Sequence, residues 1–168
     1  NFLTDLTFLE DNIKNTNFNN KLFLDEFFHG LKLKSYSFDK YKSKKENQIY
    51  KISISLITKT LKLSKNKRFD SLIEGIALTK DLVSEPGNIL HPDEYSKRLL
   101  RLKKNGLKVS VLNEKQLKKL GMNALLGVGQ GSIRGSYLVI LEWNGTKSTE
   151  KPLAFVGKGV CFDTGGIS

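Results

Sequence analysis

Two short apolar runs near the end of the chain constrain its fold more than any other feature. They are YLVILEW, residues 137–143, and PLAFV, residues 152–156. Strands that form nearly continuous apolar runs are typical of the centre of a sheet that is covered on both faces. An alternating strand pattern at 107–112 and a helix pattern at 114–120 precede them. Strand, helix and further strands in this order predict an α/β layer from residue 88 onward.

The first half of the chain predicts two helices and one more strand. KLFLDEFFHG, residues 21–30, is rich in apolar residues and predicts a helix that ends at Gly30. YKISISLI, residues 50–57, alternates and predicts a half-buried strand, and the polar, basic residues before it are expected to connect the two. A helical period of apolar residues over 69–83 stops before a Pro-Gly breaker, and this helix is expected to link two domains.

HPDEYSKRLLRLKKNG, residues 91–106, carries the start and stop signals of a helix. A proline and two acidic residues lie in its first turn, lysines lie near its end, and Asn105-Gly106 closes the pattern. Asn113 is expected to cap the short helix that follows the next strand. GVGQGS, residues 127–132, does not match the G-x-G-x-x-G dinucleotide fingerprint, and no helix pattern follows it, so a nicotinamide site is not expected.

The chain is strongly basic, with a formal net charge of +11. Eleven lysines fall between Lys32 and Lys67, and only four of the 28 basic residues are arginines. A basic segment of this kind can attract nucleic acid, but proteins that read bases and phosphates favour the planar arginine fork. Nucleic-acid binding through this segment is therefore the less favoured alternative.

The sequence also bears on the compartment. No apolar run approaches 18 residues, and the N-terminus lacks the basic stretch and apolar core of a signal peptide. The single cysteine, Cys161, rules out an intrachain disulfide and is typical of a reducing compartment. We therefore expect a cytoplasmic protein without membrane association. Because the chain lacks an initiating Met and stops abruptly at Ser168, we expect it to be a segment of a longer protein.

The final stretch, FVGKGVCFDTGGIS, changes from an apolar run to a series of glycines that carry one lysine and one aspartate. Ligands bind at the carboxyl ends of strands in open α/β sheets, so Lys158 and Asp163 lie where chemistry is expected. Glycines allow the backbone to approach a ligand closely. A plainer interpretation is a tight loop with one exposed lysine and one turn aspartate. The two widely separated histidines, His29 and His91, do not form a histidine-based zinc cluster.

Several segments resemble, in the same order, the leucyl (cytosol) aminopeptidases of peptidase family M17. VGKGVCFDTGGIS resembles the most diagnostic motif of that family. The resemblance begins near residue 25 and continues to the end of the chain. Its segments are GLKLKSYSFDKYKSKK (30–45), LVSEPGN (82–88), LKKLGMNALLGVGQGS (117–132) with YLVILEWNG (137–145), and VGKGVCFDTGGIS (156–168).

The resemblance implies a two-domain α/β protein. Residues 1–68 would form the C-terminal part of an N-terminal domain, residues 69–87 a linker helix, and residues 88–168 the first part of a mixed-sheet catalytic domain with a dinuclear metal centre. It also implies a homohexamer that acts on peptide substrates and releases N-terminal residues with a leucine-type preference.

The resemblance extends to single site residues. Lys158 resembles the lysine that ligates one of two divalent ions, and Asp163 resembles the aspartate that touches both. The implied ions are zinc, exchangeable with manganese or magnesium, and they share a bridging water. A carboxylate can supply both oxygens for such a pair. A lysine binds a metal only as the neutral amine, and losing that proton at pH 7 costs a free lysine roughly 4–5 kcal/mol.

Two residues of the motif depart from the family pattern, and further site residues of the family are expected beyond this chain. Cys161 stands where threonine is common, and Thr164 where serine is common. We predict that Cys161 is a buried neutral thiol, with metal-catalysed oxidation or thiol ligation as alternatives. The catalytic residues of the family, further carboxylate ligands and an arginine that holds bicarbonate are expected beyond Ser168. This segment alone is therefore expected to be inactive, and a catalytically dead scaffold is the alternative for the whole protein.

Overall fold

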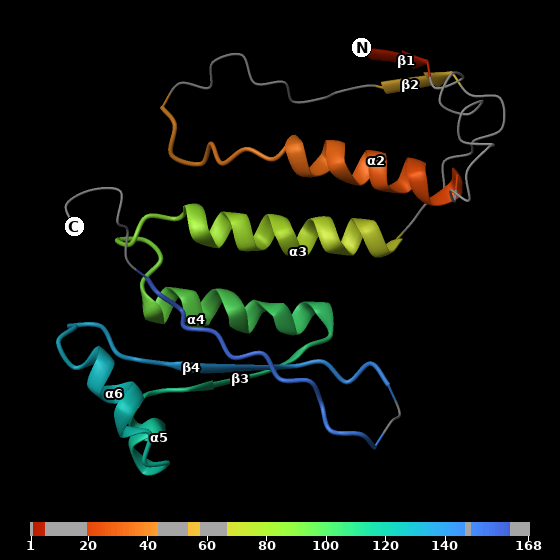
Figure 1. Cartoon of the computed structure of the whole chain (residues 1–168). Helices are drawn as coiled ribbons and strands as arrows, with labels where there is room; N and C mark the ends of the chain where they lie inside the picture. Colours follow the sequence, from red (N-terminus) through yellow and green to blue (C-terminus); the bar gives the residue numbers. More distant parts are fainter. Residues whose placement is uncertain (1, 6–19, 44–53, 58–66, 147–148, 162–168) are drawn as a thin grey trace. The chain divides into compact units, whose positions relative to one another are not determined.

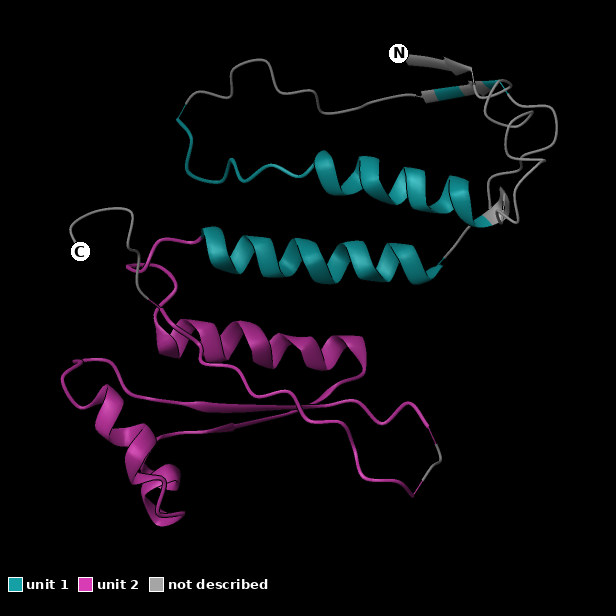
Figure 2. Ribbon diagram, in the orientation of Figure 1, with its two compact units in different colours: residues 1–84 teal, residues 85–168 magenta. Residues whose placement is uncertain are grey.

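The structure is a computed structural model of the chain, and it describes residues 2–5, 20–43, 54–57, 67–146 and 149–161. The chain divides into two compact units, residues 1–84 and residues 85–168 (Figure 2). Both units combine helices and strands, so the fold is mixed α/β, as expected. None of the helices in these described ranges is long and apolar enough to cross a membrane.

The described residues of unit 1 form one pair of strands and two helices (Figure 1). β1 (Phe2–Asp5) and β2 (Ile54–Ile57) are parallel, with Phe2 opposite Ile54. α2 (Asn20–Lys34) packs against α3 (Lys67–Ser84). Parallel strands need a long crossover connection, and α2 lies in the sequence between the two strands.

Contacts between α2 and α3 explain why α2 is longer than we predicted. The ring centroids of His29 and Phe69 lie 4.9 Å apart. Lys80 Nζ donates a hydrogen bond of 3.3 Å to the carbonyl oxygen of Leu33. These contacts lie on either side of Gly30, where we had placed the helix end. A glycine inside a helix costs about 1 kcal/mol relative to alanine, and the packing against α3 offsets that cost. The prediction that α2 ends at Gly30 was therefore wrong.

Unit 2 is built around an antiparallel pair of strands. β3 (Lys108–Leu112) pairs with β4 (Leu138–Glu142), and Ser110 lies opposite Ile140. α4 (Pro92–Leu100) packs against both strands (Figure 1). The strand predictions at 107–112 and 137–143 are thus confirmed to within one residue at each end.

The helices of unit 2 follow their local signals in part. Asn113 caps α5 (Glu114–Lys119) with a capping box, because its side chain accepts from the Gln116 amide while the Gln116 side chain accepts from the Asn113 amide. The pattern at 91–106 forms α4 and then the 3₁₀-helix η1 (Arg101–Asn105), which ends at Gly106 with φ 83°. A left-handed φ favours glycine at this position.

One prediction for unit 2 was wrong, and one helix was not predicted. The helix that we did not predict is α6 (Asn123–Gly129), which covers the start of the GVGQGS segment. Residues 133–137, which follow the segment, form no helix. Residues 152–156 do not form a strand, and the side chains of Leu153, Phe155 and Val156 are 81%, 89% and 99% exposed. A strand needs a neighbour for its backbone N–H and C=O groups, and within the described ranges β3 and β4 pair only with each other.

β4 also differs from the central strand that we expected. Its side chains at Ile140 and Leu141 are 41% and 43% exposed, so the sheet in the described part of unit 2 is not covered on both faces. The core of unit 2 consists instead of Leu90, Val109 and Leu117. The predicted division of the chain at residues 68 and 87 stays a prediction.

Candidate metal centre

Lys158 lies in residues 151–161, which follow β4 and have no regular secondary structure. It is exposed, and among the described residues its side chain makes no hydrogen bond or ion pair. Asp163, the second predicted ligand, lies outside the described residues. The structure therefore shows the surroundings of one predicted ligand.

The backbone around Lys158 forms a short turn. The Val160 amide donates a hydrogen bond of 3.1 Å to the Lys158 carbonyl, which closes a three-residue turn centred on Gly159. The Cys161 thiol donates to the Gly159 carbonyl at an S···O distance of 3.6 Å. Two consecutive carbonyls of the turn are thus occupied by donors from the next two residues.

Cys161 is half-buried, and burial raises the pKa of its thiol. A thiol with a raised pKa stays protonated at neutral pH and can donate a hydrogen bond. The predicted neutral state is therefore supported, although the side chain is less buried than we expected.

The aromatic ring of Tyr95 lies directly against Gly159. A Cβ atom built at Gly159 would come within 3.0 Å of Tyr95 Cε1 and 3.5 Å of Cδ1. By contrast, a Cβ atom at Gly157 would meet nothing within 4 Å. The turn that carries Lys158 is therefore in close contact with α4 through a glycine.

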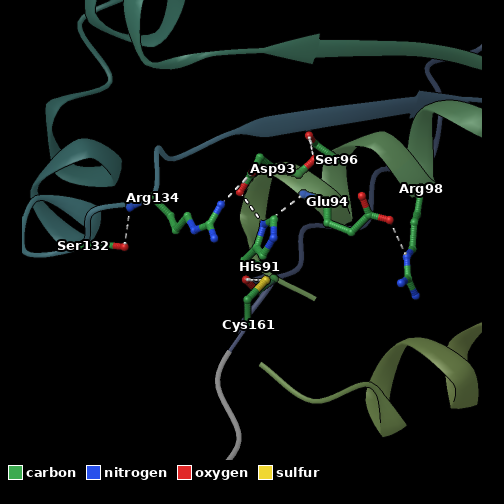
Figure 3. Close-up of polar contacts among 9 residues, drawn as sticks. His91, Asp93, Glu94, Ser96, Arg98, Ser132, Arg134 and Cys161 are labelled. Atoms are coloured by element: carbon green, nitrogen blue, oxygen red, sulfur yellow. Dashed lines mark hydrogen bonds and ion pairs between the residues drawn. The ribbon is translucent and has the colours of Figure 1, made fainter. Parts of the chain in front are cut away.

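A bridge of three charged residues holds α4 in place. Arg98 Nη1 lies 2.7 Å from Glu85 Oε1. Arg98 Nε lies 3.0 Å from Glu94 Oε1 (Figure 3). The Glu85 side chain is only 2% exposed. The hydrogen bond from Arg98 to Glu85 raises the pKa of Arg98 in spite of desolvation, and the hydrogen bond from Arg98 lowers the pKa of Glu94. The bridge therefore consists of charged partners and ties the segment before α4 to its middle.

A second network lies at the N-terminus of α4. His91 caps the helix, with Nδ1 2.5 Å from Asp93 Oδ1 and 3.4 Å from the Glu94 amide nitrogen. Arg134 Nη1 lies 3.3 Å from Asp93 Oδ2 and links the segment before β4 to the helix (Figure 3). Burial alone would raise the pKa of Asp93, but hydrogen bonds from its own amide and from His91, with attraction by His91 and Arg134, lower it. The carboxylate thus stays ionised and holds both partners.

These features fit one side of a metal site. Among the described residues, the Lys158 amine has no carboxylate partner, and Gly159 leaves room against the Tyr95 ring that a Cβ would fill. Both features are compatible with a ligand at Lys158. Within the described ranges, no group of three His, Cys, Asp or Glu side chains could hold a metal ion. Asp163 lies outside the described residues, so its pairing with Lys158 at a metal site stays a prediction.

Comparison with known families then assigns the chain. The profile of the "Cytosol aminopeptidase family, catalytic domain" matches residues 77–168, which include α4, both strands of unit 2 and the Lys158 turn. The chain belongs to the cytosol aminopeptidase family. The predicted family is thus confirmed.

Curated relatives from the cytosol aminopeptidase family are similar over most of the chain. A "Probable cytosol aminopeptidase" of Phytoplasma australiense is 50% identical over 145 residues, which cover 84% of this chain and 29% of that protein. Proteins of the same name from Nitrobacter winogradskyi and Brucella anthropi are 46% and 48% identical, and each match covers 83% of this chain and 29% of the relative. The chain therefore spans less than a third of the length of these relatives.

Two solved structures of the bottromycin maturation enzyme BotP also resemble the chain. The structure in complex with Mn has a TM-score of 0.53 and 26% sequence identity, and the match covers 69% of this chain and 24% of that chain. The second has a TM-score of 0.54, 26% identity, and coverage of 69% and 25%.

Around Lys158 we did not predict the contributions of Tyr95, Glu85 and Arg98. Glu94 and Arg98 are four residues apart on α4, a spacing that signals an ion pair on a helix. Glu85 and Arg98 are 13 residues apart on either side of a turn. Tyr95 and Gly159, which are in contact, are 64 residues apart in the sequence. No local spacing rule indicates these two contacts.

Proposed function

We propose that the whole protein is a metal-dependent aminopeptidase that releases N-terminal residues from peptides, and that Lys158 and Asp163 are ligands of its metal centre. The observation that carries the proposal is the family match over residues 77–168, which contains both side chains. The amine of Lys158 is exposed, has no ion-pair partner among the described residues and lies on a hydrogen-bonded turn, which supports its role. The Mn complex of the similar BotP structure supports a divalent metal.

The chemistry of the two side chains agrees with this role. Divalent ions, when bound, polarise a scissile carbonyl and make water a stronger nucleophile at neutral pH. Lys158 would contribute one amine nitrogen and Asp163 two carboxylate oxygens, a donor set that suits borderline ions such as Zn²⁺ and Mn²⁺. Cys161 is not among the proposed ligands, because its thiol is engaged with the Gly159 carbonyl.

The finer parts of the proposal rest on the family resemblance. We propose a leucine-type preference, zinc or manganese in the site with magnesium as a substitute, bicarbonate as a further component, a homohexamer, and a cytoplasmic location. We also propose that this chain alone, without the remaining ligands, does not turn over substrate. A catalytically dead scaffold is the alternative, and a metal-loaded whole protein without activity would support it.

No described contact favours nucleic-acid binding by the basic segment. Much of the segment between Lys32 and Lys67 lies outside the described residues. Lys32 lies 2.7 Å from Asp70, and Lys42 lies 2.5 Å from Asp39, so both lysines have acidic partners. This alternative stays a prediction.

The proposal is tested on the whole protein with a leucine-anilide substrate. After treatment with a chelator the activity should be lost, and Mn²⁺ or Zn²⁺ should restore it. Lys158→Met, which keeps the length of the side chain but removes the amine, should lower kcat/KM at least ~100-fold. Lys151→Met removes an exposed lysine of the same segment and is the matched control, with activity unchanged. Equal activity of the Lys158→Met protein and the wild type would refute the role of Lys158.

A further inference from the structure

We propose that Tyr95 is a positioning residue for Lys158: its ring supports the turn of residues 158–160 and so holds the amine where a divalent ion binds. The inference deepens the proposed function and rests on it for the role of the metal. It assigns to α4 a part in the site, although α4 itself carries no proposed ligand.

The first step is steric. Gly159 approaches the Tyr95 ring so closely that an added Cβ would lie 3.0 Å from Cε1, a distance tighter than ordinary van der Waals contact. Two residues earlier, Gly157 has open space around the same position. The need for a glycine is therefore specific to the residue that contacts the ring.

The second step excludes backbone conformation as the reason for the glycine. Among the described glycines only Gly106 and Gly121 have a positive φ, so Gly159 does not have a left-handed conformation. A three-residue turn with a negative φ at its centre is open to any L-residue. Contact with Tyr95 is thus the feature that requires Gly159 to lack a side chain.

The third step is the rigidity of the support. Tyr95 lies on α4 between the His91–Asp93 cap and the Arg98 bridge to the nearly inaccessible Glu85. A shift of the ring away from an added methyl group would have to displace this helix or move the Tyr95 side chain from its rotamer. The turn, which has no regular secondary structure, is the side that yields more easily.

The fourth step connects the support to the ligand. Lysine carries its amine on four flexible methylene groups and loses rotamer entropy when the amine is fixed. A backbone that is already held reduces the freedom that remains to be lost. Groups that orient a ligand in this way typically change metal affinity about 10–100-fold when they are removed.

The first experiment uses metal-free whole protein and measures hydrogen exchange at the Val160 amide, which donates to the Lys158 carbonyl. Gly159→Ala and Tyr95→Leu should each speed this exchange about tenfold, because the turn loses its close contact with the Tyr95 ring and opens more often. Gly157→Ala, with the same chemical change in open space, and Tyr95→Phe, which keeps the contacting ring carbons, should exchange as the wild type does.

Two results would overturn the inference. One is equal acceleration in Gly157→Ala and Gly159→Ala, which would make backbone freedom the cause. The other is unchanged exchange in a folded Tyr95→Leu protein. If Tyr95→Leu does not fold, the pair of glycine variants decides, because both alter an exposed segment.

The second experiment measures Mn²⁺ binding at Lys158. It distinguishes failure of the proposed metal site from failure of the positioning role of Tyr95. The Lys158 amine is labelled with an acylating reagent over a Mn²⁺ titration, and mass spectrometry compares it with the exposed Lys151 in the same protein. Mn²⁺ should protect Lys158 in the wild type, and Gly159→Ala and Tyr95→Leu should need about tenfold more Mn²⁺. Equal labelling of wild-type Lys158 with and without Mn²⁺ would refute the proposed function itself. Protection in all variants at the same Mn²⁺ concentration would refute the positioning role of Tyr95 alone.

Discussion

Unit 2 contains two regions with apolar side chains in opposite environments. Val109 on β3 and Leu117 on α5 are 5% and 0% exposed, whereas Leu153 and Phe155 in the segment after β4 are 81% and 89% exposed. The first region carries the strand pattern at 107–112 and the helix pattern at 114–120, and the second carries the apolar strand pattern at 152–156. The difference is that β3 has β4 as a hydrogen-bonding partner, while residues 152–156 have none among the described residues. An apolar run thus predicts a preference for burial, and a partner is needed before that preference forms a strand.

The largest effect is expected at the support of α4. Arg98→Met would remove the arginine partner of the buried Glu85 carboxylate, which should lower the free energy of unfolding by about 3–5 kcal/mol. Lys108→Met removes a pair with Glu142 whose side chains are 77% and 50% exposed, so it should cost no more than about 1 kcal/mol. Urea denaturation measures both. Similar losses in the two variants would mean that the Arg98 bridge does not anchor the helix.

The two apolar regions can be compared directly by truncation. Leu117→Ala should destabilise by about 2–5 kcal/mol because it leaves a cavity in the core of unit 2. Leu153→Ala should change stability by less than about 0.5 kcal/mol because the side chain is exposed. Thermal and urea unfolding give both values. A large loss for Leu153→Ala would show that this residue is buried in solution and that the predicted strand at 152–156 forms.

A smaller effect is expected at the start of α5. Asn113→Ala removes the side-chain acceptor of the capping box and should cost about 1 kcal/mol. Asn113→Ser, which can still accept from the Gln116 amide, should recover most of the loss. Circular dichroism during urea unfolding provides the measurement, and equal losses in the two variants would contradict the cap.

The smallest effect is expected on acidification. The pKa values of Asp93 and Glu94 are lowered in the folded protein, so the unfolded chain binds protons more tightly. The stability that these carboxylates contribute is present above about pH 4 and is lost as the pH falls through their folded pKa values. Urea midpoints between pH 7 and pH 3 should therefore decline less steeply in Asp93→Asn than in the wild type. A steeper or identical decline would contradict the proposed network.

Local signals predicted the elements that depend on neighbours in the sequence. The capping box at Asn113, the left-handed stop at Gly106 and the alternating strand at 107–112 all arise from interactions within a few residues. α2 continued past Gly30 because contacts with α3 outweigh the helix propensity of one glycine. α6 was missed because two glycines lie within its short span.

In the candidate site, too, local sequence signals do not predict contacts between residues that are distant in the sequence. The resemblance to the family motif predicted Lys158 and Asp163 as ligands, which stays a prediction, whereas the family itself is confirmed by the match over residues 77–168. The packing of Tyr95 against Gly159 joins residues 64 positions apart, and periodicity carries no information on such a contact. The burial of the Glu85–Arg98 pair likewise depends on how the segment before α4 folds back on the helix.

The central claim is tested most directly by anomalous X-ray scattering from crystals of the whole protein loaded with Mn²⁺ or Zn²⁺. The account predicts an anomalous peak at coordination distance, about 2.1 Å, from Lys158 Nζ, with a carboxylate oxygen of Asp163 on the same ion and Gly159 against the Tyr95 ring. A metal-loaded, active protein whose ions lie away from both side chains would contradict it.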